Sequence, residues 1–151
     1  MKTAVVIFNG IQFPFYFVDH AIGWATKNEG AIHGLFIHSD KEPDEGYVFP
    51  SDIDPAVNIY NKEDAEKSNK NVIQSQIKLF TDMTRGKNIS ARTNELINPS
   101  LEDILQYTTG ADILLIDGAF DKAYLLAVTK FQLKDLTEQS KCPVEIVYDK
   151  K

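Results

Sequence analysis

The feature that most constrains the fold is an uninterrupted apolar run, Ile113 to Ile116, which Asp117 and Gly118 follow directly. A run of this length without polar alternation is typical of a strand that is buried on both faces of a parallel sheet. Gly110, just before it, is typical of the end of a helix. In an open parallel sheet, ligands bind beyond the carboxyl ends of the strands. The residues at the end of this run are therefore the first candidates for a binding site.

Predicted strands and helices alternate along the sequence, which indicates a single α/β domain over residues 1–151 with right-handed crossovers. Apolar runs predict strands over residues 3–8, 31–37, 89–96, 113–116 and 143–148, the third of them nearer the sheet edge. Helices are predicted to begin near residues 14–17 and 98 and to cover residues 62–85 and 123–137. Residues 41–61 are predicted to form a long loop, which is acidic through Asp44, Glu45, Asp52 and Asp54.

Charge and composition exclude several classes of protein. The net charge of −6 argues against a nucleic-acid-binding surface. A single cysteine, Cys142, cannot form an internal disulfide, which fits a reducing compartment. The apolar residues near the N-terminus lead into Asn9 and Gly10 and predict a strand, not a signal peptide. No segment approaches the roughly 20 apolar residues of a membrane span. We expect a cytoplasmic protein without membrane or nucleic-acid partners.

The order and spacing of these segments resemble the universal stress protein family over nearly the whole chain. Residues 110–118 are similar to the family's Gly-Ala-Asp, apolar run and glycine, and residues 142–147 are similar to its closing strand. The resemblance implies a three-layer α/β fold, adenine nucleotide alpha hydrolase-like and Rossmann-like, with an open parallel five-stranded sheet in the order 3-2-1-4-5. It also implies a homodimer, commonly formed through the last strand. Val144, Ile146 and Tyr148 are the candidates for that edge.

The nucleotide motif of the ATP-binding members is mostly missing. Those members carry G-x-x-G, then nine residues, then Gly-Ser or Gly-Thr, which lets backbone amides hold the phosphates. Gly118 fits the first glycine, but Asp121 stands at the second. Residues 131–132, or 130–131 after a one-residue deletion, stand at the third glycine and the hydroxyl. Asn9 replaces the acidic residue that those members use near the adenine. The scaffold is kept, and the phosphate loop is not.

Two carboxylates near Gly118 disfavour a triphosphate. Asp117 and Asp121 bracket this glycine, and two like charges about 4 Å apart repel by roughly 4 kcal/mol at an intermediate dielectric. Bound Mg²⁺ would reverse the sign, because it prefers hard oxygen ligands. Asp117 and Asp121 are therefore possible Mg²⁺ neighbours, although two carboxylates alone do not define a metal site.

Each remaining candidate has a structural alternative. Gly118 is either a remnant of a phosphate loop or a plain turn after a strand, and the turn is favoured. Asn9 and Gly10 either line a small cleft beside it or form a turn pair. None of the three histidines shows metal-ligand spacing, and a solvated side chain is the favoured interpretation of His38.

These observations lead to two main hypotheses. The first is a universal stress-type regulatory or stress-response protein, a non-catalytic homodimer without a cofactor. It would not bind ATP and would act through protein contacts or a small ligand. The alternative is a member that binds ATP or AMP with Mg²⁺, with slow or no hydrolysis, through Asn9, Gly10, the backbone near Ile37, and Gly118. A flavodoxin-like or receiver-like module is disfavoured, because no phosphorylatable aspartate follows the third predicted strand.

Overall fold

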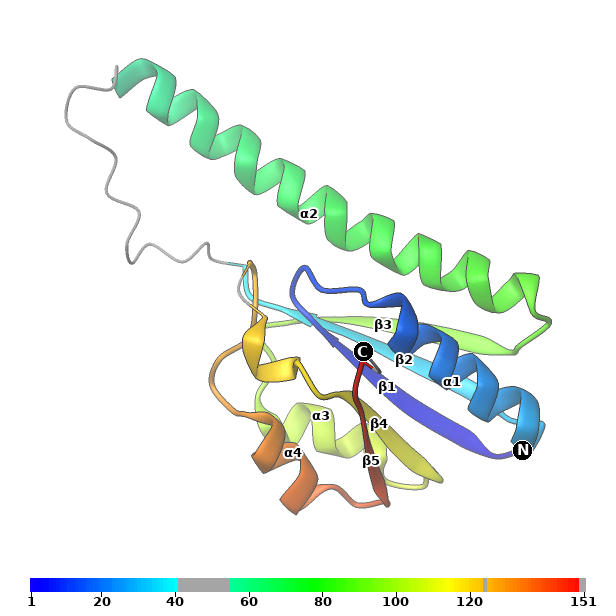
Figure 1. The fold of residues 1–151 in the computed structure, drawn as a ribbon. Coiled ribbons are helices and arrows are strands. Elements are labelled where there is room, and N and C mark those ends of the chain that lie inside the picture. The colour runs from blue at the N-terminus through cyan, green and yellow to red at the C-terminus, as the bar shows by residue number, and fades with distance from the viewer. Residues whose placement is uncertain (41–54, 124, 150–151) are drawn as a thin grey trace.

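The computed structural model describes residues 1–40, 55–123 and 125–149, and within 55–70 it describes the backbone alone. Five parallel strands form one sheet in the order β3-β2-β1-β4-β5, with helices on both faces (Figure 1), so the predicted three-layer α/β architecture and strand order are confirmed. The strands are β1 (Thr3–Asn9), β2 (Ala31–His38), β3 (Ala91–Ile97), β4 (Ile113–Asp117) and β5 (Val144–Val147). The helices are α1 (Phe15–Asn28), α2 (Pro55–Gly86), α3 (Leu101–Thr108) and α4 (Leu133–Gln139), with a 3₁₀ turn, η1 (Phe120–Lys122).

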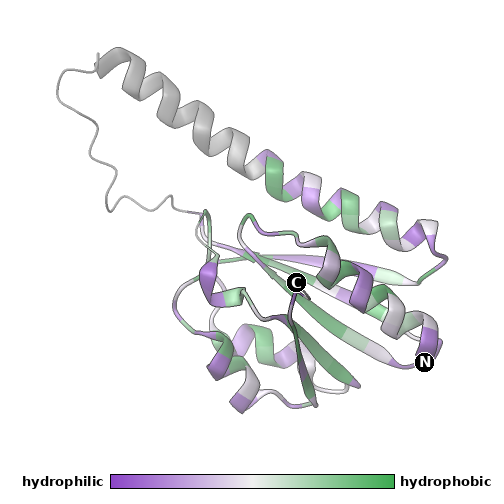
Figure 2. Cartoon of the chain, in the orientation of Figure 1, coloured by the Kyte–Doolittle hydropathy of each residue, from purple (hydrophilic) through white to green (hydrophobic). Residues whose placement is uncertain are grey.

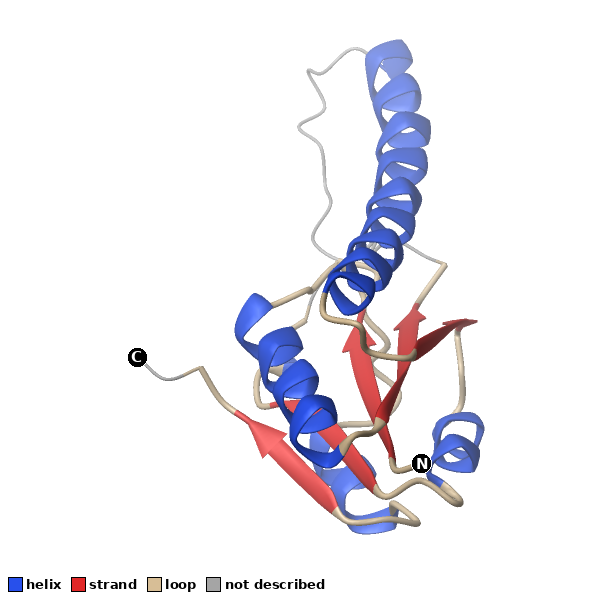
Figure 3. Cartoon of the chain, turned by 90° about the vertical axis from the view of Figure 1, so that its right-hand side faces the viewer, coloured by secondary structure: helices blue, strands red, loops and turns tan. Residues whose placement is uncertain are grey.

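The sheet has an apolar core on each of its faces, because the three inner strands carry apolar residues at almost every position (Figure 2). On one face α1 and α2 cover the sheet, and four phenylalanine rings contact one another there. They are Phe8, Phe17, Phe36 and Phe80. On the other face α3 and α4 cover the sheet (Figure 3). They contribute Ile104 and Leu136 to a second cluster. The two helix layers therefore leave the ends of the strands as the place where polar groups can gather.

Helix α2 begins at Pro55, so the prediction that residues 55–61 belong to a loop is wrong. Proline is a poor residue inside a helix but a good one in its first turn, where its missing N–H has no partner in any case. The rest of the predicted loop, with Asp44, Glu45, Asp52 and Asp54, lies outside the described residues. α2 is the longest helix, with 32 residues, but no helix in the described ranges is long and apolar enough to cross a membrane.

The helix predicted over residues 123–137 is confirmed only for residues 133–137. The turn η1 ends at Lys122, residues 125–132 are not helical, and helix α4 begins only at Leu133. Asp135 accepts a hydrogen bond from the Gln132 backbone N–H at 2.9 Å, and Asp121 accepts one from the N–H of Leu133 at 2.9 Å. These bonds satisfy amides at the new helix start, as capping residues do.

Strands β3 and β5 are the two edges of the sheet. The predicted edge position of the third strand is confirmed, although it runs over Ala91–Ile97 instead of residues 89–96. β5 pairs only with β4, so Val144 and Ile146 do lie on an edge strand, each partly buried. A glutamate between them, Glu145, forms an ion pair with His20 of α1 at 2.5 Å.

Candidate functional site

The carboxyl ends of β1 and β2 meet a segment from far along the chain, residues 125–128. Asn9, the last residue of β1, is 3% exposed, and its carboxamide forms two hydrogen bonds with the backbone of one residue of that segment, Val128. The Nδ2 group donates to the Val128 carbonyl at 3.2 Å, and the Val128 N–H donates to Oδ1 at 2.8 Å. The protein itself therefore accepts one N–H of the carboxamide and donates to its oxygen.

Further backbone hydrogen bonds hold the same segment over the sheet. The N–H of Ile11 donates to the Leu125 carbonyl at 2.9 Å, and the N–H of Ser39 donates to the Leu126 carbonyl at 2.7 Å. Leu126 is buried with a φ of 55°, a left-handed conformation that is unusual for a large side chain. Residues 125–128, which we call the crevice segment, thus lie across the ends of both strands.

Gly10 allows this close approach. Its φ is +62°, and a Cβ atom there would lie 2.5 Å from the Leu125 carbonyl oxygen and 2.8 Å from the Ala127 nitrogen. Its N–H donates to the Ile37 carbonyl at 2.8 Å, and Asn9 is the register partner of Ile37 in the sheet. The structure therefore brings these three predicted site residues together, with their backbone packed under the crevice segment.

The ring of Tyr148 explains why residue 118 is a glycine. A Cβ atom at this position would overlap the ring of Tyr148, which follows β5, and the Gly118 N–H donates to the Val147 carbonyl at 2.7 Å. No positive φ is required of Gly118, so the glycine provides space. Tyr148 is nevertheless 64% exposed. The backbone that a phosphate would have to approach is covered by this ring.

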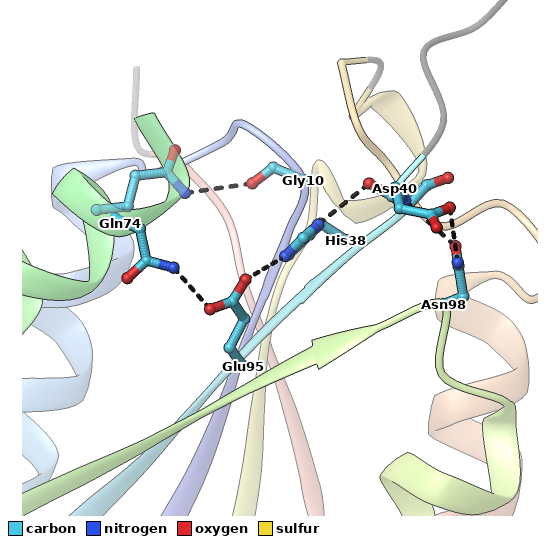
Figure 4. A network of polar contacts seen from close by, with 8 residues as sticks. Gly10, His38, Asp40, Gln74, Glu95 and Asn98 are labelled. Atoms are coloured by element: carbon cyan, nitrogen blue, oxygen red, sulfur yellow. Dashed lines mark hydrogen bonds and ion pairs between the residues drawn. The ribbon is translucent and has the colours of Figure 1, made fainter. Parts of the chain in front are cut away.

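His38, at the end of β2, is buried and paired, so the interpretation as a solvated side chain is wrong. It is 2% exposed, its Nε2 lies 2.6 Å from a Glu95 carboxylate oxygen, and its Nδ1 lies 3.1 Å from the Ser39 carbonyl (Figure 4). The ring therefore has a polar neighbour at each of its two nitrogens. The pair joins the carboxyl-terminal parts of β2 and β3.

The Glu95 carboxylate is the centre of this polar network. Its other oxygen accepts a hydrogen bond from the Gln74 side chain of α2 at 2.7 Å. Burial acts to raise the pKa of Glu95, but the hydrogen bonds from His38 and Gln74 and the charge of His38 outweigh it, so the pKa is lowered. Two residues further along α2, Gln76 donates to the Gly10 carbonyl at 3.2 Å (Figure 4). The network therefore ties α2 to the ends of three strands.

The two aspartates beside Gly118 have different surroundings. Asp117 is 3% exposed, and one of its oxygens accepts hydrogen bonds from the Tyr16 hydroxyl and, at 3.2 Å, from the Ala119 N–H. Asp121 is exposed and bonds the N–H of Leu133. In residues 1–40, 55–123 and 125–149, no group of three or more His, Cys, Asp or Glu side chains is arranged to hold a metal ion.

No protein-family model matches the sequence, and no curated protein matches it at a significant level. Comparison of the folded chain with solved structures gives a different result. A universal stress family protein from Burkholderia pseudomallei superposes with a TM-score of 0.61 and 10% identity, over 97% of this chain and 95% of that one. This chain has the universal stress protein fold. Identity this low establishes the fold and not the activity.

Two further structures with this fold hold nucleotides. A universal stress protein in complex with cAMP has a TM-score of 0.60 and 16% identity, with coverage of 97% of this chain and 96% of that chain. An Arabidopsis thaliana universal stress family protein with AMP bound has a TM-score of 0.60 and 13% identity, with coverage of 99% and 93%. In the present universal stress protein fold, the candidate nucleotide residues all lie at the carboxyl ends of their strands or directly after them. They are Asn9, Gly10, Ile37 and Gly118.

Several site residues are absent from the sequence-based predictions. Three hydrogen bonds of the site join segments that are distant in the sequence. They are the bonds between Asn9 and Val128, between His38 and Glu95, and between Tyr16 and Asp117. A β-branched pair, Val128 at the end of the crevice segment and Thr129 just after it, is the only local signal against a helix there, and it is a weak one. No local pattern identifies the other two contacts.

Proposed function

We propose that this protein is a member of the universal stress protein family, and that it is a non-catalytic regulatory or stress-response protein acting as a single-domain homodimer in the cytoplasm. The shared fold, and the similarity of residues 110–118 and 142–147 to the family's segments, support membership. We propose further that the protein does not bind ATP and acts through contacts with a protein partner or a small ligand.

The observation that carries this proposal is the pair of hydrogen bonds between Asn9 and Val128. At the position where ATP-binding members use an acidic residue near the adenine, this protein has a carboxamide, and the backbone N–H and carbonyl of Val128 both bond it. The crevice segment and the ring of Tyr148 cover the backbone of Gly10 and Gly118 respectively. A nucleotide would have to displace both, and would lose the hydrogen bonds that hold the crevice segment.

Calorimetric titration of ATP and of AMP, each with and without Mg²⁺, tests this function. We expect no saturable heat up to nucleotide concentrations of about 1 mM, which corresponds to a binding free energy weaker than about 4 kcal/mol. The matched variant is Asn9→Asp, which restores the acidic residue and puts a carboxylate against the Val128 carbonyl. Micromolar binding by the unmodified protein, or nucleotide carried through purification, would contradict the proposal.

The second candidate is a nucleotide-binding protein, favoured by the AMP and cAMP held by proteins of the same fold. In that case Asn9, Gly10, the Ile37 backbone and Gly118 would contact ATP or AMP, with Mg²⁺ near Asp117 and Asp121. The crevice segment and Tyr148 would have to move away. Nuclear magnetic resonance separates the two candidates, because nucleotide-induced shift changes at the Val128 amide and the Tyr148 ring are expected only for the second.

A further inference from the structure

Asp117 has one carboxylate oxygen without a partner. Its Oδ1 atom accepts hydrogen bonds from the Tyr16 hydroxyl and the Ala119 N–H, whereas its Oδ2 atom is buried and has no hydrogen-bond partner among the described residues. The side chain is also absent from every ion pair found in that part of the chain. Protonation would not resolve this, because a proton on Oδ2 would then lack an acceptor.

Buried polar atoms are nearly always satisfied, by protein, water or a bound group, and a buried carboxylate in particular is paired or binds a cation. The Tyr16 hydroxyl adds a second oxygen, since a hydroxyl that donates one hydrogen bond still has free lone pairs. Burial, the bond to Asp117, and the negative charges of Asp117 and Asp149 raise the pKa of Tyr16, so this hydroxyl stays neutral. The carboxylates of Asp117 and Asp149 thus both disfavour deprotonation of the Tyr16 hydroxyl.

This position is separate from the crevice segment. Val147, the register partner of Asp117, lies in the core cluster on the α1 side of the sheet. Val5 and Ile7, which alternate with Asn9 along β1, lie in the cluster on the α3 and α4 side. Asp117 therefore faces α1, and Asn9 faces the opposite layer. Both lie near the junction of β1 and β4, the point of an open sheet where ligands gather.

We propose that Asp117 and Tyr16 bind a singly charged cation at the carboxyl end of β4, with Asp117 Oδ2 as its anionic partner. One buried carboxylate balances one positive charge, and the described residues offer no group of three ionisable ligands that a divalent ion would use. The cation is either an alkali ion such as K⁺ or the ammonium group of a small amine. This proposal does not depend on whether the protein binds nucleotides.

Thermal unfolding in different chloride salts at equal ionic strength tests it. Relative to tetramethylammonium chloride, which can neither donate a hydrogen bond nor fit a small site, we expect KCl and ammonium chloride to raise the unfolding midpoint. At a cation concentration about ten times the dissociation constant, the expected rise in the unfolding midpoint is about 3–6 °C for a chain of this size. Methylammonium chloride separates an alkali-ion site from an amine site, because it stabilises the protein only if the site accepts an amine.

Asp117→Asn should abolish the difference between salts, and Tyr16→Phe should reduce it. The matched control is Asp121→Asn, which removes the same charge from an exposed carboxylate and should keep the difference. If Asp117→Asn does not fold, crystals of the unmodified protein soaked in thallium chloride replace it, with an anomalous peak expected beside Oδ2. Equal midpoints in all salts, an undiminished shift in Asp117→Asn, or no thallium peak there would overturn the proposal and leave a buried water as the partner.

Discussion

The ring of Tyr148 lies so close to the backbone of Gly118 that a single added methyl group on the glycine would overlap it. The two residues belong to neighbouring strand ends, and the Gly118 N–H bonds the carbonyl of Val147, next to the tyrosine. The glycine after β4 is therefore required by a side chain of the protein, without any need for a bound phosphate.

This relationship predicts the effect of Gly118→Ala. The added Cβ would force the Tyr148 ring to move, and we expect a loss of about 1–3 kcal/mol in the free energy of unfolding, measured in urea. In a Tyr148→Ala background the same substitution should cost much less, which a double-mutant cycle would detect. Gly23→Ala is the matched control, because no atom lies within 4 Å of its added Cβ, and in helix α1 alanine should stabilise slightly. Equal costs in both backgrounds would refute the overlap.

A second prediction concerns Asn9→Ala. The substitution leaves the buried N–H and carbonyl of Val128 without their partner, and we expect the free energy of unfolding to fall by about 1–3 kcal/mol. Hydrogen exchange at the Val128 amide should accelerate more than exchange in the central strands, because the crevice segment opens locally. The comparison variant is Asn28→Ala, which removes one partly buried hydrogen bond at the end of α1. Unchanged exchange at Val128 would show that Asn9 does not hold the segment.

Acid pH should weaken the link between His38 and Glu95. The pKa of Glu95 is lowered in the folded protein, so its ionised form stabilises the fold. This stability is fully present above the unfolded-state pKa, near 4.5, and is lost as the pH falls through the lower pKa of the folded state. Glu95→Gln should therefore flatten the decline of the unfolding free energy below about pH 4.5. Glu138→Gln, on an exposed glutamate of α4, serves as the control. A decline of the same steepness in Glu95→Gln would exclude this role.

The homodimer proposed for this protein gives a fourth prediction. If the free edge of β5 forms the interface, Ile146→Lys should convert a dimer into a monomer in light scattering after size-exclusion chromatography, because a lysine would be buried there. Ile97→Lys makes the same change on β3, the opposite edge, and should leave the dimer intact. Circular dichroism would establish that both variants remain folded. Dissociation by the β3 variant alone would move the interface to the other edge.

The sequence by itself determined the parts of this protein that depend on local patterns. The apolar run Ile113–Ile116 and the similar stretch after Thr3 predict doubly buried strands, because burial on both faces leaves no polar position in a strand. The alternation of such runs with helical periodicity predicts the α/β class. The residue types at the ends of β1 and β4, Asn9 and Asp117, are likewise visible in the sequence as candidates for a site.

Only the tertiary structure decided what those residues do. Asn9 and Val128 are 119 positions apart. The crevice segment is as apolar as a helix would be, but its backbone hydrogen bonds go to residues at and just after the strand ends, not to its own neighbours. His38 has the sequence context of a solvated residue, but it is buried and bonds Glu95 of β3, which Gln74 of α2 bonds in turn. Local propensity is worth tenths of a kilocalorie per residue, whereas buried partners across the sheet are worth more and can come from anywhere in the chain.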